Sequence, residues 1–149
     1  MMPLLSRITR GLALALLVAP AVPALAQTTQ FRKVPPERLE NYWIVLNTQV
    51  DADMPNTGRN LDKPGCVAVS YVIGSEGNPT NIEVAKVVPD SDLGSAAKSM
   101  VARFHYGPSL SNKDDRQPIA TYYVVSFNLP SDPAQAKQIS AACQLPGYH

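Results

Sequence analysis

Histidine is the side chain best suited to acid–base chemistry at neutral pH, and this sequence contains only two, His105 and His149. His105 stands between two aromatic residues directly before Gly107-Pro108, a position typical of a helix end. The sequence contains no Gly-x-Ser-x-Gly, His-Glu-x-x-His, Cys-x-x-Cys or phosphate-binding glycine motif. We therefore predict that the protein is not an enzyme, with no catalytic residue and no cofactor.

Two acidic residues, Asp51 and Asp53, have the spacing that opens a calcium-binding loop. The residue three positions after Asp53 is Asn56, and no acidic residue closes such a loop. We interpret the pair as a solvated acidic turn and predict no metal site.

The first 26 residues have the three-part pattern of a secretory signal peptide. Residues 1–10 carry two arginines and no acid, residues 11–19 are apolar, and Ala24-Leu25-Ala26 is a small-x-small cleavage site. The alternative is a membrane anchor, which needs about 20 apolar residues. The uncharged stretch here is shorter and contains two prolines. We predict export and cleavage after Ala26.

Export determines how the two cysteines are interpreted. In an oxidising compartment an even pair favours a disulfide, so we predict a bond between Cys66 and Cys143. It would close a loop of about 77 residues and stabilise the fold by about 4 kcal/mol in the loop-entropy model. A buried free thiol with a second, stray thiol is the alternative.

Composition and charge exclude several classes of function. The chain carries 13 Lys and Arg against 12 Asp and Glu, so neither nucleic acid nor an anionic bilayer is an expected partner. Hydrophobic residues make up 45% of the sequence, which is enough for the core of one domain and excludes wholesale disorder.

Three stretches have the pattern of β-strands. Large residues recur at every second position over residues 67–73, and apolar and polar residues alternate over residues 81–88, with a glycine-rich hairpin turn at residues 74–79 between them. Residues 119–129 form a third apolar stretch, which is bounded by prolines. We predict that these strands form one antiparallel sheet.

An amphipathic helix is predicted between the second and third strands. Ser91 or Asp92 can cap it, and it should end near Phe104. Its apolar stripe has the spacing i, i+4, i+7 and i+11 and consists of Leu93, Ala97, Met100 and Phe104. The predicted fold is therefore α+β, with the order β-β-α-β and one helix packed on one face of a three-stranded sheet.

Extra helices are predicted at both ends of this domain. Residues 36–49 have apolar residues at helical spacing, although the run Tyr42-Trp43-Ile44-Val45-Leu46 also suits a strand. Asp132 can cap a short helix near the C-terminus. The chain then divides into a leader (residues 1–26), an N-terminal extension (27–53), a central domain (54–130) and a helical tail (131–149).

Between Met54-Pro55 and Leu129-Pro130 a series of short motifs occurs in a fixed order: Gly65-Cys66-Val67, Glu76-Gly77, Pro89, Leu93 and Ala97, and Arg103-Phe104-His105-Tyr106-Gly107-Pro108. In the order and spacing of these motifs the sequence resembles the C-terminal domain of TonB-family energy transducers. Two positions depart from the family pattern, since Met54 replaces the usual Tyr and Phe104 a frequent Trp. The extension before Met54 is also much shorter than the long proline-rich spacer of a transducer.

The resemblance implies a periplasmic protein-binding module linked to transmembrane transport. An extended peptide, such as a segment of an outer-membrane TonB-dependent receptor, would pair with the edge of the third strand. We expect Tyr122 or Tyr123, with Ser126 and Asn128, to determine specificity. Two alternatives stay open: an envelope structural or assembly protein that forms a homodimer through the sheet edge, or a membrane-anchored transducer with an uncleaved leader. No small-molecule substrate is expected.

Overall fold

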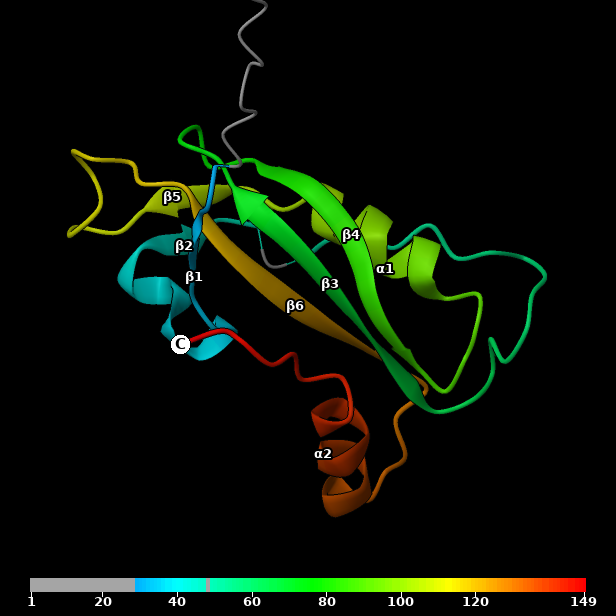
Figure 1. Ribbon diagram of the computed structural model, residues 1–149. Helices are drawn as coiled ribbons and strands as arrows, with labels where there is room; N and C mark the ends of the chain where they lie inside the picture. Colours follow the sequence, from blue (N-terminus) through cyan, green and yellow to red (C-terminus); the bar gives the residue numbers. More distant parts are fainter. Residues whose placement is uncertain (1–28, 48) are drawn as a thin grey trace, which may run out of the picture.

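The computed structural model describes residues 29–47 and 49–149, so the predicted leader lies outside the described residues. The architecture is α+β, as predicted, with one long sheet, one short sheet and two α-helices (Figure 1). The elements are β1 (Arg32–Lys33), the 3-10 helix η1 (Pro36–Asn41), β2 (Trp43–Val45), β3 (Gly65–Ile73), β4 (Pro79–Val88), α1 (Gly94–Ala102), β5 (Tyr106–Pro108), β6 (Ile119–Phe127) and α2 (Pro133–Ala141).

The long sheet has the strand order β1-β6-β3-β4. Its three long strands are the three that the sequence predicts, and β3 pairs antiparallel with both β4 and β6. The register between β3 and β6 is unbroken from Gly65↔Phe127 to Ile73↔Ile119, whereas β4 shifts register twice against β3. The two-residue strand β1 adds a parallel partner at the start of β6.

The main core lies between α1 and one face of the sheet. Val67, Val69, Tyr71 and Ile73 of β3 are buried there together with residues of α1 such as Ala97 and Val101. The opposite face carries a second cluster, in which Cys66 and Ala68 meet the chain around α2. Because both faces of β3 are covered, this strand reads as a nearly continuous apolar run.

The glycine-rich turn between β3 and β4 has the hairpin role predicted for it. Gly77 has a φ of 82°, in the left-handed region that glycine adopts without strain. Its N–H donates to Gly74 O at 2.9 Å, and its own carbonyl accepts the N–H of Tyr106 at 2.9 Å. The turn is therefore also a contact between the long sheet and β5.

The N-terminal helix predicted over residues 36–49 is wrong beyond Asn41, where η1 ends. Trp43–Val45 instead forms β2, which pairs antiparallel with β5. The N–H of Leu46 extends this pairing by donating to His105 O at 2.7 Å. The strand-forming residues after Asn41 follow their β propensity because a distant segment provides a partner strand.

The two helix caps have different outcomes. Asp132 caps α2 as predicted, since its Oδ1 accepts the N–H of Ala134 at 2.8 Å. Neither Ser91 nor Asp92 caps α1, which begins at Gly94 without a side-chain cap. Asp92 accepts the backbone N–H of Arg59 at 2.7 Å and its guanidinium at 3.2 Å, so its carboxylate fastens a loop. These contacts hold the pKa of Asp92 below its usual value and raise that of Arg59.

Candidate functional site

The short strand β1 covers only the beginning of the outer edge of β6. Arg32 and Lys33 pair with Ile119 and Ala120, and the N–H of Val34 donates to Ala120 O at 2.9 Å. In a parallel ladder the next donor on this side would be residue 36, which is a proline and has no N–H. The chain leaves the sheet at this point and enters η1.

Among the described residues, no strand lies beside the outer edge of β6 beyond Ala120. Backbone groups alternate direction along a strand, so the N–H and C=O groups of Tyr122, Val124 and Ser126 point outward like the carbonyl of Ala120. Within residues 29–47 and 49–149 these outward groups have no hydrogen-bond partner. Such an edge is a template for pairing with another extended chain.

The opposite edge of the sheet, formed by β4, is less suited to pairing. β4 carries two register shifts against β3, and Asn81 within it has a φ of 50°. Glu83 and Lys86 are exposed on the same strand. Bulges and charges discourage the addition of a strand. β6 has an unbroken register and no charged residue, so its outer edge is the better candidate site.

A groove of about 330 Å³ runs beside this edge on the face that carries α2. Pro36 and Glu37 of η1 line one side, Val124 lies in β6, and Lys137 and Ser140 of α2 line the other side. We call it the α2 groove. Its walls carry one residue of each charge, Glu37 and Lys137, and the hydroxyl of Ser140, but most of its lining is apolar.

A second hollow, also of about 330 Å³, involves residues of η1, β2 and β6. We call it the aromatic hollow, because five aromatic side chains in addition to Tyr122 line it. It shares Pro36, Tyr122 and Tyr123 with the α2 groove, so the two spaces adjoin at the edge of β6. The five aromatic residues are Trp43, Tyr71, Phe104, Tyr106 and Tyr123.

Three of the aromatic side chains around the hollow have their polar atoms hydrogen-bonded within the protein, and Glu40 and Asn47 also line the hollow. The hydroxyls of Tyr71 and Tyr106 lie 2.6 Å apart, and the indole N–H of Trp43 donates to Gln117 O at 2.9 Å. Burial raises the pKa of Tyr106 to about 12 and that of Tyr71 well above its usual value, so both hydroxyls keep their protons. The hollow therefore presents ring surfaces without an unmet polar group among these three aromatic side chains.

The structure brings Tyr122 and Tyr123 together at the open edge, with different exposures. Tyr123 is 41% exposed and packs edge-to-face on Phe104, with ring centroids 5.1 Å apart. Tyr122 is 4% exposed and packs against Tyr148, with centroids 4.9 Å apart. The side chain of Tyr123 is thus accessible at the edge, whereas the side chain of Tyr122 is buried.

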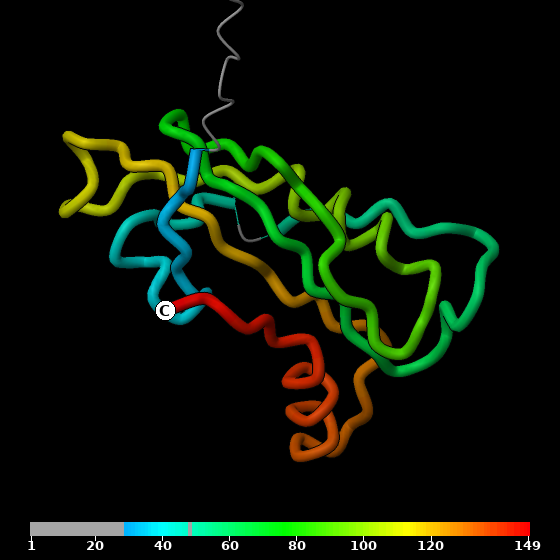
Figure 2. Tube along the Cα trace, viewed as in Figure 1, coloured from blue at the N-terminus to red at the C-terminus, as the bar shows by residue number. Residues whose placement is uncertain are grey.

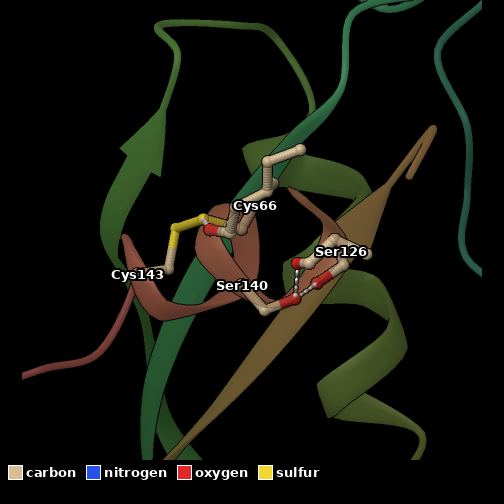
Figure 3. The surroundings of a disulfide bond; sticks show 6 residues. Cys66, Ser126, Ser140 and Cys143 are labelled. Atoms are coloured by element: carbon tan, nitrogen blue, oxygen red, sulfur yellow. Dashed lines mark hydrogen bonds between the residues drawn. A yellow bond between two sulfur atoms is a disulfide. The ribbon is translucent and has the colours of Figure 1, made fainter. Parts of the chain in front are cut away.

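Ser126 and Asn128 make contacts within the protein. The Oγ atoms of Ser126 and Ser140 lie 2.9 Å apart, joining β6 to α2 (Figure 3). Asn128 lies after β6, and its side-chain amide donates to the carbonyls of Leu61 at 2.8 Å and Lys63 at 3.1 Å. Ser126 still presents outward backbone groups, and Asn128 holds a loop.

Sequence reasoning missed the parts of the site that come from outside β6, namely Pro36, Lys137 and the aromatic side chains of other elements. The Pro35-Pro36 pair is a signal that could have located the end of β1, because two prolines cannot continue a ladder. The walls themselves depend on long-range packing and leave no local pattern.

The predicted disulfide is confirmed: Cys66 and Cys143 are bonded, with an S–S distance of 2.06 Å (Figure 3). The bond ties the start of β3 to the chain just after α2. From there the tail runs back along the sheet towards β1, where the Nζ of Lys33 lies 5.6 Å from the ring of Tyr148 (Figure 2). The disulfide therefore fastens the helix that forms one wall of the α2 groove.

The acidic pair Asp51 and Asp53 contacts an arginine. The guanidinium of Arg103 donates to Asp53 Oδ1 at 2.7 Å and to the carbonyl oxygen of Asp51. Among the residues with described positions, no three potential metal ligands of the His, Cys, Asp or Glu type come together.

An α+β domain with an open sheet edge between two hollows has the layout of a protein-binding module. Residues 54–129, about half of the chain, match the family model of the Gram-negative bacterial TonB protein C-terminal. The chain belongs to this family. It is a family of non-enzymatic interaction and transducer domains of the bacterial envelope, which contact proteins such as outer-membrane receptors in TonB-dependent transport.

Among solved structures, the solution NMR structure of the Pseudomonas aeruginosa TonB CTD is similar to this chain, with 18% identity and a TM-score of 0.41. The match covers 60% of this chain and 89% of that one. No curated protein matches the sequence. Within the described ranges, no helix combines the length and apolar character that a membrane span requires. The elements η1, β2 and α2 lie outside the residues that match the family model.

Proposed function

We propose that this protein is a periplasmic binding module that takes up an extended peptide as a new strand along the outer edge of β6. The peptide pairs with the outward backbone groups of Tyr122, Val124 and Ser126, and it continues the line that β1 begins. Its source is a plug-proximal segment of an outer-membrane TonB-dependent receptor. The observation that carries the proposal is the unpaired edge that follows Ala120.

Backbone pairing alone provides part of the affinity. Each added hydrogen bond contributes about 0.5–1.5 kcal/mol net, and association has a large entropic cost. The side chains of the peptide must therefore contribute as well. The α2 groove and the aromatic hollow lie beside the edge, where those side chains would reach them.

The proposed compartment depends on the leader. The pattern of residues 1–26 supports export, and the Cys66–Cys143 bond suits an oxidising compartment. N-terminal sequencing of the exported protein tests this part: a chain that begins at Gln27 supports a released periplasmic module. A chain that retains its leader would indicate the anchored transducer.

Val124 offers a matched pair of variants for testing strand addition. Its N–H points to the open edge, so Val124→Pro removes an edge donor without removing a β3–β6 hydrogen bond. Val124→Ala shortens the side chain and keeps the N–H. We expect Val124→Pro to weaken binding by about tenfold or more and Val124→Ala to change it much less.

The measurement is fluorescence anisotropy with fluorescein-labelled ten-residue peptides from the plug-proximal segments of TonB-dependent receptors. Circular dichroism and thermal unfolding establish that both variants are folded. Equal binding by the two variants, or no binding of any peptide to the original protein, would contradict the proposal.

An edge that accepts a peptide also accepts a second copy of the chain. Analytical ultracentrifugation of the purified protein distinguishes receptor-peptide binding from self-pairing. A dimer that Val124→Pro dissociates and that receptor peptides do not compete with would support self-pairing in the envelope. A monomer that binds peptide supports the receptor-binding module.

A further inference from the structure

The aromatic hollow beside the edge of β6 restricts which peptides fit. We infer that the peptide carries one bulky apolar side chain that enters the aromatic hollow, while its two neighbours in sequence face α2. This inference rests on the strand addition proposed above and specifies its ligand.

Alternation along a strand connects the two spaces. Successive side chains of an added strand point to opposite faces of the sheet. Tyr123 lies on the face of the main core, and Val124 lies on the face of α2. Because both spaces reach the edge at Tyr122 and Tyr123, consecutive peptide residues there enter different spaces.

The aromatic hollow suits an apolar side chain. Three large apolar residues on its lining remain exposed: Ile44 by 50%, Val45 by 37% and Tyr123 by 41%. Its volume of about 330 Å³ is at the lower end of the range for ligand pockets, which suits one large side chain better than a whole ligand. Filling it would remove apolar surface from water on both partners.

The wall that completes the aromatic hollow is held in position by several hydrogen bonds. The carbonyl of Tyr42 accepts the N–H of Ser109 at 2.9 Å and the side-chain amide of Asn112 at 3.1 Å. The hydroxyl of Ser109 donates to Asn41 O at 2.8 Å. Since η1 and β2 are fixed before binding, little ordering is needed when a side chain enters.

The test begins with selection of binders from a random ten-residue peptide display library on the purified protein. We expect the selected peptides to share one bulky apolar residue. Replacing that apolar residue by Ala in a labelled synthetic copy should weaken binding by about tenfold or more, as expected for losing a buried large apolar side chain.

A pair of variants with matched exposure assigns this effect to the hollow. Ile44→Ser changes the lining, whereas Met54, which is 51% exposed and does not line the hollow, provides the control Met54→Ser. In Ile44→Ser the difference between the two peptides should shrink to about threefold or less, and in Met54→Ser it should persist.

The outcomes separate this inference from the proposed function. Val124→Pro could weaken peptide binding while neither the apolar residue of the peptide nor Ile44 affects it. That result would overturn the inference and leave strand addition supported. If the selected peptides bind the Val124→Pro variant as tightly as the original protein, both strand addition and the inference are wrong.

Discussion

The hydroxyl oxygens of Tyr71 and Tyr106 lie 2.6 Å apart in the interior, so one hydroxyl donates to the other. Tyr71 belongs to β3, the central long strand, and Tyr106 begins β5, the partner of β2. The pair therefore joins the two sheets beside the aromatic hollow. Their rings also stack, with centroids 6.3 Å apart.

Removing one hydroxyl of this pair should destabilise the protein more than removing both. Tyr106→Phe leaves the Tyr71 hydroxyl buried without its partner, at a cost of about 1–3 kcal/mol, and Tyr71→Phe has the same effect in reverse. The double variant should be more stable than the sum of the two losses predicts. Urea unfolding with the disulfide intact measures the four proteins, and additivity within about 0.5 kcal/mol would contradict a direct pair.

The stability of the folded protein should fall at high pH. Burial raises the pKa of Tyr106 to about 12 and that of Tyr71 well above 10.0, whereas both titrate near 10 in the unfolded chain. The folded state thus favours the protonated hydroxyls. The contribution of this preference to the free energy of unfolding is complete below pH 10 and is lost as the pH rises towards 12. Urea unfolding between pH 8 and 11.5 checks this, with Tyr106→Phe expected to show a shallower fall.

Gly77 cannot be replaced without a change in the β3–β4 turn. A Cβ atom there would lie 2.0 Å from the carbonyl oxygen of Tyr106, and the φ of 82° is unfavourable for other residues. Gly77→Ala should therefore destabilise the protein by more than about 1 kcal/mol. Gly74→Ala is the matched control, because its nearest neighbour would be 3.6 Å away. Similar thermal unfolding of the two variants would contradict this account.

The long strands were predictable from sequence because the residues that each strand buries lie within that strand. β3 and β6 have alternating or consecutive apolar residues along their length, and the apolar stripe through Ala97 forms the buried face of α1. The segment after Asn41 was not predictable in this way. Its strand depends on pairing with Tyr106–Pro108, a contact that spacing within residues 36–49 does not encode.

The candidate site was predictable as an edge, and its side chains were not. The third strand could be chosen from the family resemblance. That β1 covers the beginning of this strand depends on a long-range pairing, although Pro36 indicates where such cover must end. The burial of Tyr122 follows from the tail that the disulfide holds near the sheet. Both faces of β6 are covered, so alternation alone could not show which tyrosine remains exposed.

Loss of the disulfide should destabilise the fold and loosen α2 first. The bond closes a loop with a sequence separation of 77, so Cys66→Ala/Cys143→Ala should cost about 4 kcal/mol by the loop-entropy model. α2 contains no fully buried residue, and besides the disulfide it is held by the partly buried Ile139 and by the hydrogen bond between Ser140 and Ser126. Hydrogen exchange should then accelerate in Pro133–Ala141 more than in β3.

A reductant provides the control for this prediction. It should lower the stability of the original protein towards that of the double variant and leave the double variant unchanged. Unaltered exchange in α2 after loss of the bond would show that packing alone holds the wall of the α2 groove.

Trp43 should report directly on occupation of the aromatic hollow. It is the only tryptophan in the sequence, it is 1% exposed, and it lines the hollow with its indole N–H bonded to Gln117 O. A peptide whose apolar residue enters the hollow changes the surroundings of this ring, so the emission of Trp43 should shift during titration. The dissociation constant from emission should equal that from anisotropy. The peptide with Ala at the apolar position, at saturating concentration, should bind with little change in emission. Equal emission changes for both peptides would place the apolar side chain elsewhere on the edge.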